Sequence, residues 1–403
     1  MRAGVRAAGL LLVAAASASV GAEPRTELGR RFPVSLELSA ARPSRDLPHC
    51  APGDTARYMR ARLRVLAGSP GRWYLTVRDA SGRAVEVLTA GSFSGDGTHW
   101  TMRIPGCRLR FELQLAGVPP PPARIEVIEY LAMPERARNP YYSIQTAGHP
   151  RYQDLYAVPD DAVRILGDAV GMVMPSHRQV SWCCSGVAVG ENLVLTNWHC
   201  GGPEGLAHAL VWSDEICADT LVDFSWDGDG VSREFRCARV LALDEDLDFA
   251  LLEVEPLTGQ GPARPVVVRE TPPVDGERLR LVHHPECTTK QITLNCDVAR
   301  ALWPSWTRRT PGVDLAHRCD TEEGSSGGAV LDAAGRLVAL HHRGFARTTD
   351  QEAMAGRLNV AVRLDRILGF LDACTDATPR CTAGLRARVN VEAAGGPGPG
   401  GGH

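Results

Sequence analysis

The chain has 403 residues, of which 44% are hydrophobic and 23% are charged, a length and composition typical of about two globular domains. Its formal net charge is -3 and its pI is near 6.5. This balance excludes the strongly basic surface that nucleic acid or an anionic membrane attracts, so we expect neither partner.

The first 22 residues have the three parts of a secretory signal peptide. Arg2 and Arg6 form a basic head, residues 7–20 are apolar, and residues 20–22 are small enough for a signal peptidase. The apolar run is too short to span a bilayer, and no later stretch is longer and more apolar. We expect a mature chain that begins near Glu23, a secreted or periplasmic location and no membrane insertion.

Residues 24–130 contain short runs with strand-like alternation, separated by turn residues such as Gly, Ser, Pro and Asp. Many short strands at this spacing predict a β-sandwich of about 100 residues. The predicted strands are 61–65, 73–77, 85–88, 100–104, 109–115 and 125–128. This region carries no catalytic motif, and binding, assistance in folding and structural support all remain open as its role.

Two further segments have no clear periodicity. Residues 131–159 are rich in Pro, Arg, Tyr and Gly, and we expect a linker there, with a second domain over residues 160–373. We expect residues 374–403 to form a tail, disordered from about residue 393, where the chain is nearly all Gly and Pro.

In the second domain, two polar residues stand at the ends of apolar runs. His199 closely follows residues 193–195, which indicates a strand that delivers a histidine to its end. Asp248 stands directly before residues 249–252, a buried strand by its composition. Asp246 lies on the same face of that segment by alternation and is the alternative acid.

The third motif is the run from Gly324 to Ala329, in which Ser326 is flanked by glycines. Glycine lets a substrate backbone approach closely and allows backbone angles that other residues avoid. Taken alone, the run is also compatible with a flexible loop. A serine becomes a nucleophile only beside a base and an orienting acid, and His199 and Asp248 are candidates for those roles.

Together these motifs resemble the chymotrypsin-like (trypsin-like) serine peptidases, in which His, Asp and Ser occur in this order. The spacing also resembles that family, with 49 residues from His199 to Asp248 and 78 from there to Ser326. Cys200 directly follows the histidine and lies 16 residues after Cys184, as in the family's disulfide beneath its catalytic histidine. The resemblance covers residues 160–373.

The resemblance implies an all-β fold with two six-stranded barrels, a triad at their seam and a closing helix. The strands expected in the barrels are 170–173, 186–189, 248–254, 265–268, 278–282, 291–294 and the hairpin 329–341, and the expected helix is 362–371. The implied activity is that of a serine endopeptidase acting on protein or peptide substrates without a cofactor. The amides of Gly324 and Ser326 are the expected oxyanion hole.

The chain departs from the digestive members of the family at Ser325. Those enzymes have an aspartate there, which pairs with a new amino terminus after zymogen cleavage, so we expect activity here without such cleavage. The pattern is similar to the bacterial glutamyl-endopeptidase-like branch. Asp320 matches the acid that binds Arg or Lys in trypsin-like enzymes, whereas Thr321 and His341 match the residues that hold a Glu side chain.

We lean slightly toward acidic substrates and leave this specificity open. His342, Glu322 and Glu323 are expected at the rim of the pocket or behind it. His283-His284 and His341-His342 are adjacent pairs on strands, and neighbours on a strand point to opposite faces, so a metal site is not expected.

The 12 cysteines agree with an oxidising compartment. Besides the disulfide between Cys184 and Cys200 that the family resemblance implies, four pairings are guesses. They are Cys50 with Cys107, Cys217 with Cys237, Cys287 with Cys296, and Cys374 with Cys381, and they leave Cys183 and Cys319 without an assigned partner. No CxxC pair is present, which argues against a zinc finger.

Two other functions are alternatives to a peptidase. A catalytically silent homologue could act as an extracellular binding protein through the N-terminal domain, although the complete triad and the intact glycine loop argue against silence. An esterase of the α/β-hydrolase type needs Ser before Asp before His along the chain, and the order here is the reverse.

Overall fold

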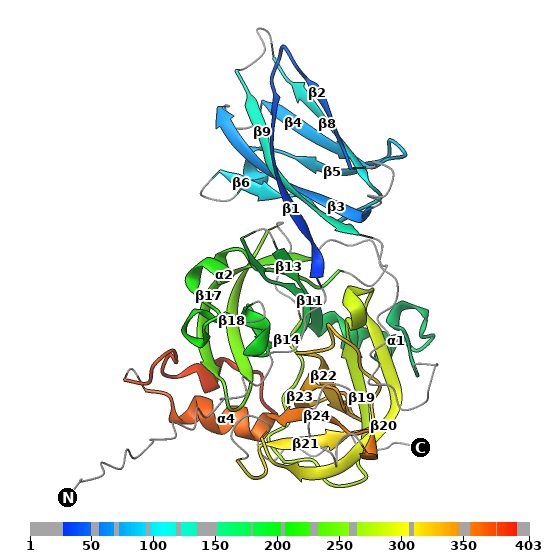
Figure 1. Ribbon diagram of the computed structural model, residues 1–403, viewed down its shortest axis with the longest axis vertical. Coiled ribbons are helices and arrows are strands. Elements are labelled where there is room, and N and C mark those ends of the chain that lie inside the picture. The colour runs from blue at the N-terminus through cyan, green and yellow to red at the C-terminus, as the bar shows by residue number, and fades with distance from the viewer. Residues whose placement is uncertain are drawn as a thin grey trace, which may run out of the picture.

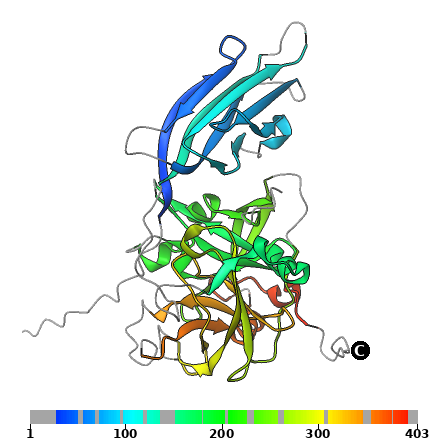
Figure 2. The same ribbon diagram turned by 90° about the vertical axis from the view of Figure 1, so that its right-hand side faces the viewer.

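The computed structural model has two parts stacked along its long axis (Figures 1 and 2). The N-terminal part lies at the top of Figure 1 in blue to cyan, and the larger C-terminal part lies below it. The residues that the structure describes are 27–49, 56–67, 72–93, 97–117, 122–134, 151–178, 180–202, 206–225, 233–257, 264–305, 310–345, 355–375 and 377–392. The expected signal peptide and the segment from residue 393 lie outside them.

The N-terminal domain consists of two β-sheets around one hydrophobic core, as a β-sandwich requires. One sheet contains β1 (Glu27–Leu38), β3 (Ala56–Ala67), β6 (Thr98–Trp100), β7 (Ile104–Pro105) and β9 (Arg124–Pro134). The other contains β2 (Ser44–Pro48), β4 (Trp73–Arg78), β5 (Ala84–Leu88) and β8 (Arg108–Leu115). All six predicted segments overlap these strands. Strands β1 and β2 lie outside the predicted segments. In β1, Pro33 lies at a register shift of the β1–β9 pairing, where a missing N–H is tolerated.

The first barrel of the C-terminal domain is closed by six antiparallel strands. They are, in order around the barrel, β11 (Val170–Met174), β14 (Cys184–Gly190), β15 (Leu193–Thr196), β18 (Phe249–Pro256), β17 (Glu234–Asp244) and β16 (Leu221–Asp223). Every residue of β11, β14 and β15 is buried, which explains their continuous apolar character.

The second barrel closes because the long strand β20 (Gln291–Trp303) pairs with two neighbours, β19 and β21. Its other strands are β19 (Arg278–His283), β22 (Ala329–Asp332), β23 (Leu337–Arg343), β24 (Asn359–Arg363) and β21 (Asp314–His317). The predicted fold class, an all-β chain with two six-stranded barrels, is confirmed. The expected strand over residues 265–268 is wrong, because Val268 makes only isolated bridges, to Leu337 and Val391.

Few helices accompany the barrels in the described part of the chain. They are α1 (Asp161–Leu166), α2 (Asp214–Ala218) and α4 (Leu364–Ala373), besides short 3-10 turns. The predicted closing helix is α4, which buries Leu364, Ile367, Leu368 and Leu371 along one face. None of the helices in the described residues has both the length and the apolar character needed to cross a membrane.

Two predicted boundaries need correction. Of the expected linker 131–159, residues 131–134 belong to β9, and β10 (Tyr152–Asp154) pairs with β20 of the second barrel. Residues 135–150 lie outside the described part. The expected tail is folded as far as residue 392, because Leu385 and Val389 are buried and Asn390 donates its N–H to the Val189 carbonyl at 2.7 Å.

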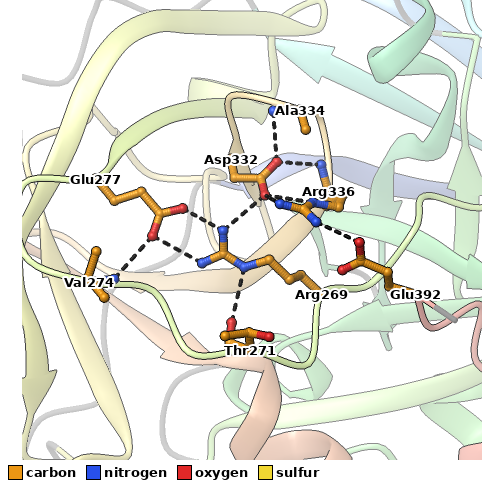
Figure 3. A network of polar contacts seen from close by, with 8 residues as sticks. All are labelled: Arg269, Thr271, Val274, Glu277, Asp332, Ala334, Arg336 and Glu392. Atoms are coloured by element: carbon orange, nitrogen blue, oxygen red, sulfur yellow. Dashed lines mark hydrogen bonds and ion pairs between the residues drawn. The ribbon is translucent and has the colours of Figure 1, made fainter. Parts of the chain in front are cut away.

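A polar network anchors this C-terminal segment to the second barrel (Figure 3). The guanidinium of Arg269 lies between the carboxylates of Glu277 and Asp332, at 2.5 and 3.0 Å. Arg336 also contacts Asp332, and its Nη1 donates to Glu392 Oε1 at 2.7 Å. The segment after α4 is thus part of the folded domain, which a tail rich in small residues did not indicate.

The two domains are joined by strand pairing and by buried ion pairs. β1 continues beyond the sandwich and pairs with β13 (Val180–Trp182), whose other neighbour is β12 (Ser176–His177) (Figure 1). Arg103 forms an ion pair with Asp223, and Arg60 forms one with Glu234 at 2.7 Å. All four side chains are at most 5% exposed, so the contact excludes water.

Five disulfides are present in the described residues: Cys183–Cys287, Cys184–Cys200, Cys217–Cys237, Cys296–Cys319 and Cys374–Cys381. The guessed pairing of Cys287 with Cys296 is wrong, because Cys287 bonds Cys183 and Cys296 bonds Cys319. The packing of the barrels brings these partners together. Cys107 is also disulfide-bonded, and its expected partner Cys50 lies outside the described residues.

Candidate active site

The three residues expected to form the triad come from three chain segments that meet between the barrels. His199 begins a 3-10 turn after β15, and Asp248 stands directly before β18. Because β15 and β18 are paired, with Thr196 opposite Ala250, these two strand ends lie side by side. Ser326 comes from the loop before β22 in the second barrel.

The distances form a continuous hydrogen-bonded chain. His199 Nδ1 lies 2.7 Å from Asp248 Oδ2, and the backbone N–H of His199 donates to Asp248 Oδ1 at 2.9 Å. On its other side, His199 Nε2 lies 2.9 Å from Ser326 Oγ. Asp248 therefore fixes the ring orientation and keeps the proton on Nδ1, which leaves Nε2 free to accept the serine proton.

Asp248 is held in an unusual backbone conformation. Its φ is 45°, in the left-handed region, which aspartate tolerates better than most residues. Its carbonyl accepts a hydrogen bond from Asn197 Nδ2 at 2.8 Å. Burial would raise the pKa of this carboxyl, but the contacts with His199 and His342 hold the pKa well below its ordinary value, so the group stays ionised.

The alternative acid, Asp246, has a different environment. Its carboxylate accepts hydrogen bonds from Ser305 Oγ at 2.9 Å and Thr310 Oγ1 at 2.8 Å, both in the second barrel. It links the two barrels, and the structure places Asp248 against His199 instead.

The loop around Ser326 is compatible with the expected oxyanion hole. Gly324 has a φ of 87°, and its carbonyl accepts a hydrogen bond from Ser185 Oγ at 2.8 Å. Within the described residues, the backbone N–H groups of Gly324 and Ser326 have no hydrogen-bond acceptor. Gly327 has a φ of 83°, and a Cβ there would overlap the Ser185 carbonyl, so only glycine fits.

Ser325, which replaces the aspartate of the digestive enzymes, is fully buried. Its Oγ accepts a hydrogen bond from the Glu322 N–H at 3.0 Å and lies 2.7 Å from His283 Nδ1. Ser325 is thus held by contacts inside the second barrel.

The expected pocket residues Asp320 and Thr321 and the expected rim residue Glu322 differ in their hydrogen-bond partners. Asp320 is fully buried and accepts the Arg151 N–H at 2.7 Å, so its charge is used inside the protein. Thr321 is 1% exposed, and its Oγ1 has no hydrogen-bond partner in the part of the chain that the structure describes. Glu322 is also buried, at 7% exposure, and not at an open rim.

His341 is held by a second histidine. Cys319 donates its N–H to His317 Nδ1 at 3.2 Å, so His317 carries its proton on Nε2 and donates it to His341 Nδ1, 3.2 Å away. This leaves the proton of His341 on Nε2. Burial lowers the pKa of His341 well below its ordinary value and that of His317 to about 3, so both rings are neutral donors at neutral pH.

Sequence reasoning placed His342 only at the rim of the pocket or behind it, and it missed both the contact of His342 with Asp248 and the role of Asp314. His342 Nδ1 lies 3.0 Å from Asp248 Oδ2, and His342 Nε2 lies 3.3 Å from Asp314 Oδ2. The opposite facing of His341 and His342 was predicted, but the partner Asp314 comes from β21 and has no sequence signal. Burial opposes the charge on His342, but Asp314 and Asp248 outweigh it and raise its pKa to about 10.

Among the described residues, Cys184, His199 and Cys200 are the one group of three potential metal ligands that lie close together. The two sulfur atoms are bonded to each other, so they are not thiolate ligands. The disulfide instead anchors the segment that carries His199.

Comparison with known proteins concerns the part of the chain that carries these residues. Residues 184–340 match the model of the trypsin-like peptidase domain, so the chain contains a domain of this class. An uncharacterized protein of Sinorhizobium fredii, y4fB, is 26% identical over 179 residues, which are 40% of this chain and 25% of that protein. The chain therefore spans about a quarter of the length of that relative. The match to this domain supports the interpretation that the chain is a serine protease.

Several solved structures of proteases are similar to part of this chain at low identity. The Rv3671c protease of M. tuberculosis in its active form is 16% identical, with a TM-score of 0.40 over 62% of this chain and 98% of that chain. Deg5 is 17% identical, with a TM-score of 0.37 over 52% of this chain and 90% of that chain. The HtrA-type protease AlgW is 18% identical, with a TM-score of 0.37 over 52% of this chain and 59% of that chain.

Proposed function

We propose that the chain is an exported serine endopeptidase that hydrolyses peptide bonds through an acyl-enzyme. The observation that carries the proposal is the position of His199 Nε2, 2.9 Å from Ser326 Oγ, while its Nδ1 contacts Asp248. A hydroxyl at this distance from a neutral imidazole can transfer its proton as it attacks a carbonyl.

The steps follow from these roles. Ser326 Oγ bonds to the peptide carbonyl carbon as His199 takes its proton, and the amides of Gly324 and Ser326 stabilise the oxyanion. The intermediate collapses when His199 gives that proton to the leaving amine. A water molecule then attacks the acyl-enzyme as His199 takes its proton, and His199 returns that proton to Ser326 Oγ as the ester bond breaks and the acid product leaves. Asp248 stays ionised and stabilises the imidazolium throughout.

Covalent labelling tests the proposal directly. A fluorophosphonate should form an adduct on Ser326 of the oxidised protein, identified by peptide mass spectrometry, and Ser326→Ala should abolish both the adduct and peptide cleavage. Absence of an adduct on the folded wild-type protein would favour the alternative, a silent homologue that acts as a binding protein.

We further propose that the protein is exported with removal of residues 1–22 and needs no cleavage of the peptidase domain for activity. The internal contacts of Ser325 support the second point. Mass spectrometry of the exported protein should find a mature terminus near Glu23. Full activity of the chain with β1 still attached is expected, and activity that appears only after cleavage near residue 165 would contradict it.

For the residue before the scissile bond, we propose acidic over basic side chains. The engagement of Asp320 by Arg151 argues against capture of Arg or Lys by that carboxylate. His341 and Thr321 are neutral donors suited to an oxygen acceptor. Chromogenic peptides that end in Glu, Arg, Lys, Phe and Ala test this, and faster cleavage after Arg or Lys than after Glu would overturn it. His341→Ala should slow cleavage after Glu more than after Phe.

A further inference from the structure

A buried histidine extends the hydrogen-bonded chain from Ser326, and a buried aspartate lies against the other nitrogen of that histidine. His342 and Asp314 are each at most 1% exposed on their side chains. Asp248 Oδ2 is shared between two rings, since His199 Nδ1 lies at 2.7 Å and His342 Nδ1 at 3.0 Å. The order of contacts is therefore Ser326, His199, Asp248, His342, Asp314.

The charged groups around His342 come from several elements. Asp248 and Asp314 contact its two nitrogens, and Asp246 acts on Asp314 from the same loop as Asp248. Two neutral rings also lie near His342: His341, the preceding residue in the same strand, and His317 of β21. His199 lies on the other side of Asp248. Two carboxylates in direct contact outweigh these neutral rings, so a proton on His342 is stabilised.

We propose that His342, held by Asp314, is a positioning residue that works as a permanent imidazolium beneath the triad. It donates to Asp248 and fixes that carboxylate against His199. Its positive charge also offsets part of the attraction of Asp248 for a proton on His199, so that His199 is available as a base at lower pH. This inference rests on the proposed peptidase function and deepens it.

Two substitutions should move the acidic limb of the kcat/KM profile in opposite directions. His342→Asn keeps a hydrogen-bond donor near Asp248 but removes a positive charge, so the limb should move up by roughly one pH unit. Asp314→Asn removes a negative charge while Asp248 still holds the proton on His342, so the limb should move down by a smaller amount. A purely structural role for the pair would move neither limb.

His99→Asn is the matched control, because His99 forms a buried pair with Glu86 at 2.9 Å in the N-terminal domain, far from the triad in chain and fold. It should lower stability and leave the pH profile of the folded enzyme unchanged. Unshifted acidic limbs in both His342→Asn and Asp314→Asn would overturn the proposal.

A measurement without turnover separates this idea from the proposed function. In the Ser326→Ala protein, NMR should show the His342 ring protonated on both nitrogens at pH 8. A neutral His342 ring at that pH would overturn the inference even if the enzyme is active. If the ring is charged and the wild-type protein cleaves nothing, the proposed function fails and the charge assignment stands.

A second, independent observation concerns the peptide between Glu323 and Gly324. The Glu323 carbonyl accepts the Glu286 N–H at 2.5 Å. In a trans peptide the C=O and the following N–H point in opposite directions, so this bond turns the Gly324 N–H away from residue 286. A Cβ on Gly324 would lie 2.6 Å from the His284 carbonyl and 3.0 Å from Cys183 Sγ.

The segment that receives this carbonyl is itself constrained. Glu286 and Cys287 have φ angles of 49° and 55°, in the left-handed region, and Cys287 is bonded to Cys183 at the entry to β14. The disulfide thus ties the first barrel to the segment against which Gly324 packs. We infer that Cys183–Cys287 and the Glu286 amide are positioning groups that hold the oxyanion amide in its active orientation.

Removal of this disulfide should lower kcat with little change in KM. Cys183→Ser with Cys287→Ser is expected to reduce kcat tenfold or more, since complete loss of one oxyanion donor costs roughly 100- to 1000-fold. Cys374→Ser with Cys381→Ser, which opens a disulfide with a sequence separation of 7, is the matched control and should retain kcat.

Glu286 gives a second test that leaves the disulfide intact. Glu286→Gly keeps the N–H and accepts a positive φ, so it should retain kcat, whereas Glu286→Pro removes the donor and should lose it. Equal kcat for these two variants, with the folded fraction checked by circular dichroism, would overturn the inference. So would an unchanged kcat in the Cys183 and Cys287 double variant.

Discussion

Two clusters of buried charge in the described part of the chain use different cations. At the candidate active site, Asp248 and Asp314 contact the histidines His199 and His342. At the contact between the domains, Asp223 and Glu234 contact the arginines Arg103 and Arg60.

The difference teaches what each cluster is suited to do. Arginine is always charged, so its ion pairs fix the domains in one arrangement and cannot pass on a proton. Histidine gains and loses a proton near neutral pH, so a chain of histidines and carboxylates can respond to a proton that arrives from Ser326. In both clusters, removal of one partner should lower the free energy of unfolding, since a buried charge without its partner is strongly unfavourable.

The largest expected effect comes from removal of the base. His199→Ala should lower kcat by about a millionfold, because the serine loses its proton acceptor and the triad acts as a unit. The free energy of unfolding should fall less than in a variant that leaves a buried charge unpaired, since His342 still contacts the buried Asp248 carboxylate. Peptide cleavage and urea unfolding measure the two quantities. A loss below about a hundredfold would contradict the assigned role.

At the domain contact the expected loss is in stability. Asp223→Ala removes the carboxylate opposite Arg103 and should cost about 3–5 kcal/mol, as is typical when one partner of a buried ion pair is removed. Limited proteolysis should then cut between the domains, while kcat of the intact fraction is unchanged. The double variant Arg103→Met with Asp223→Leu should recover much of the loss, since apolar replacement of a buried pair is often neutral.

The same contact should make stability depend on pH. Burial raises the pKa of Glu234 from 4.5 to about 7, against the opposing effect of Arg60. Between these values the folded state binds more protons than the unfolded state, so stability contributed by this group falls as pH rises, by at most about 3 kcal/mol. Glu234→Gln should remove that slope. The difference between the wild-type and variant unfolding curves, measured from pH 5 to 7, tests it.

The smallest effect is expected where an ion pair is exposed. Arg236 and Glu255 lie 2.8 Å apart on paired strands, with side chains 38% and 53% exposed. Glu255→Ala should change the free energy of unfolding by at most about 0.5 kcal/mol, because water screens the pair. A cost close to that of Asp223→Ala would show that burial is not what separates the two clusters.

Local patterns in the sequence, together with the family resemblance that they carry, indicated the fold class and the three residues at the seam. Apolar runs placed His199 and Asp248 at strand ends, and the glycines around Ser326 marked an exposed turn, because strand burial and backbone freedom are written in neighbouring residues. The same local signals predicted helix α4 and the alternation that separates His341 from His342.

Contacts between distant segments were decided only by the tertiary structure. The partner of Cys183 lies 104 residues away, and Asp314 reaches His342 only because β21 and β23 both pair with β24. Nor could residue type show that Asp320 is engaged by Arg151, or that residues 377–392 pack on the barrels. Long-range pairing depends on which surfaces meet when the barrels close, and a local sequence pattern does not show which distant segments those are.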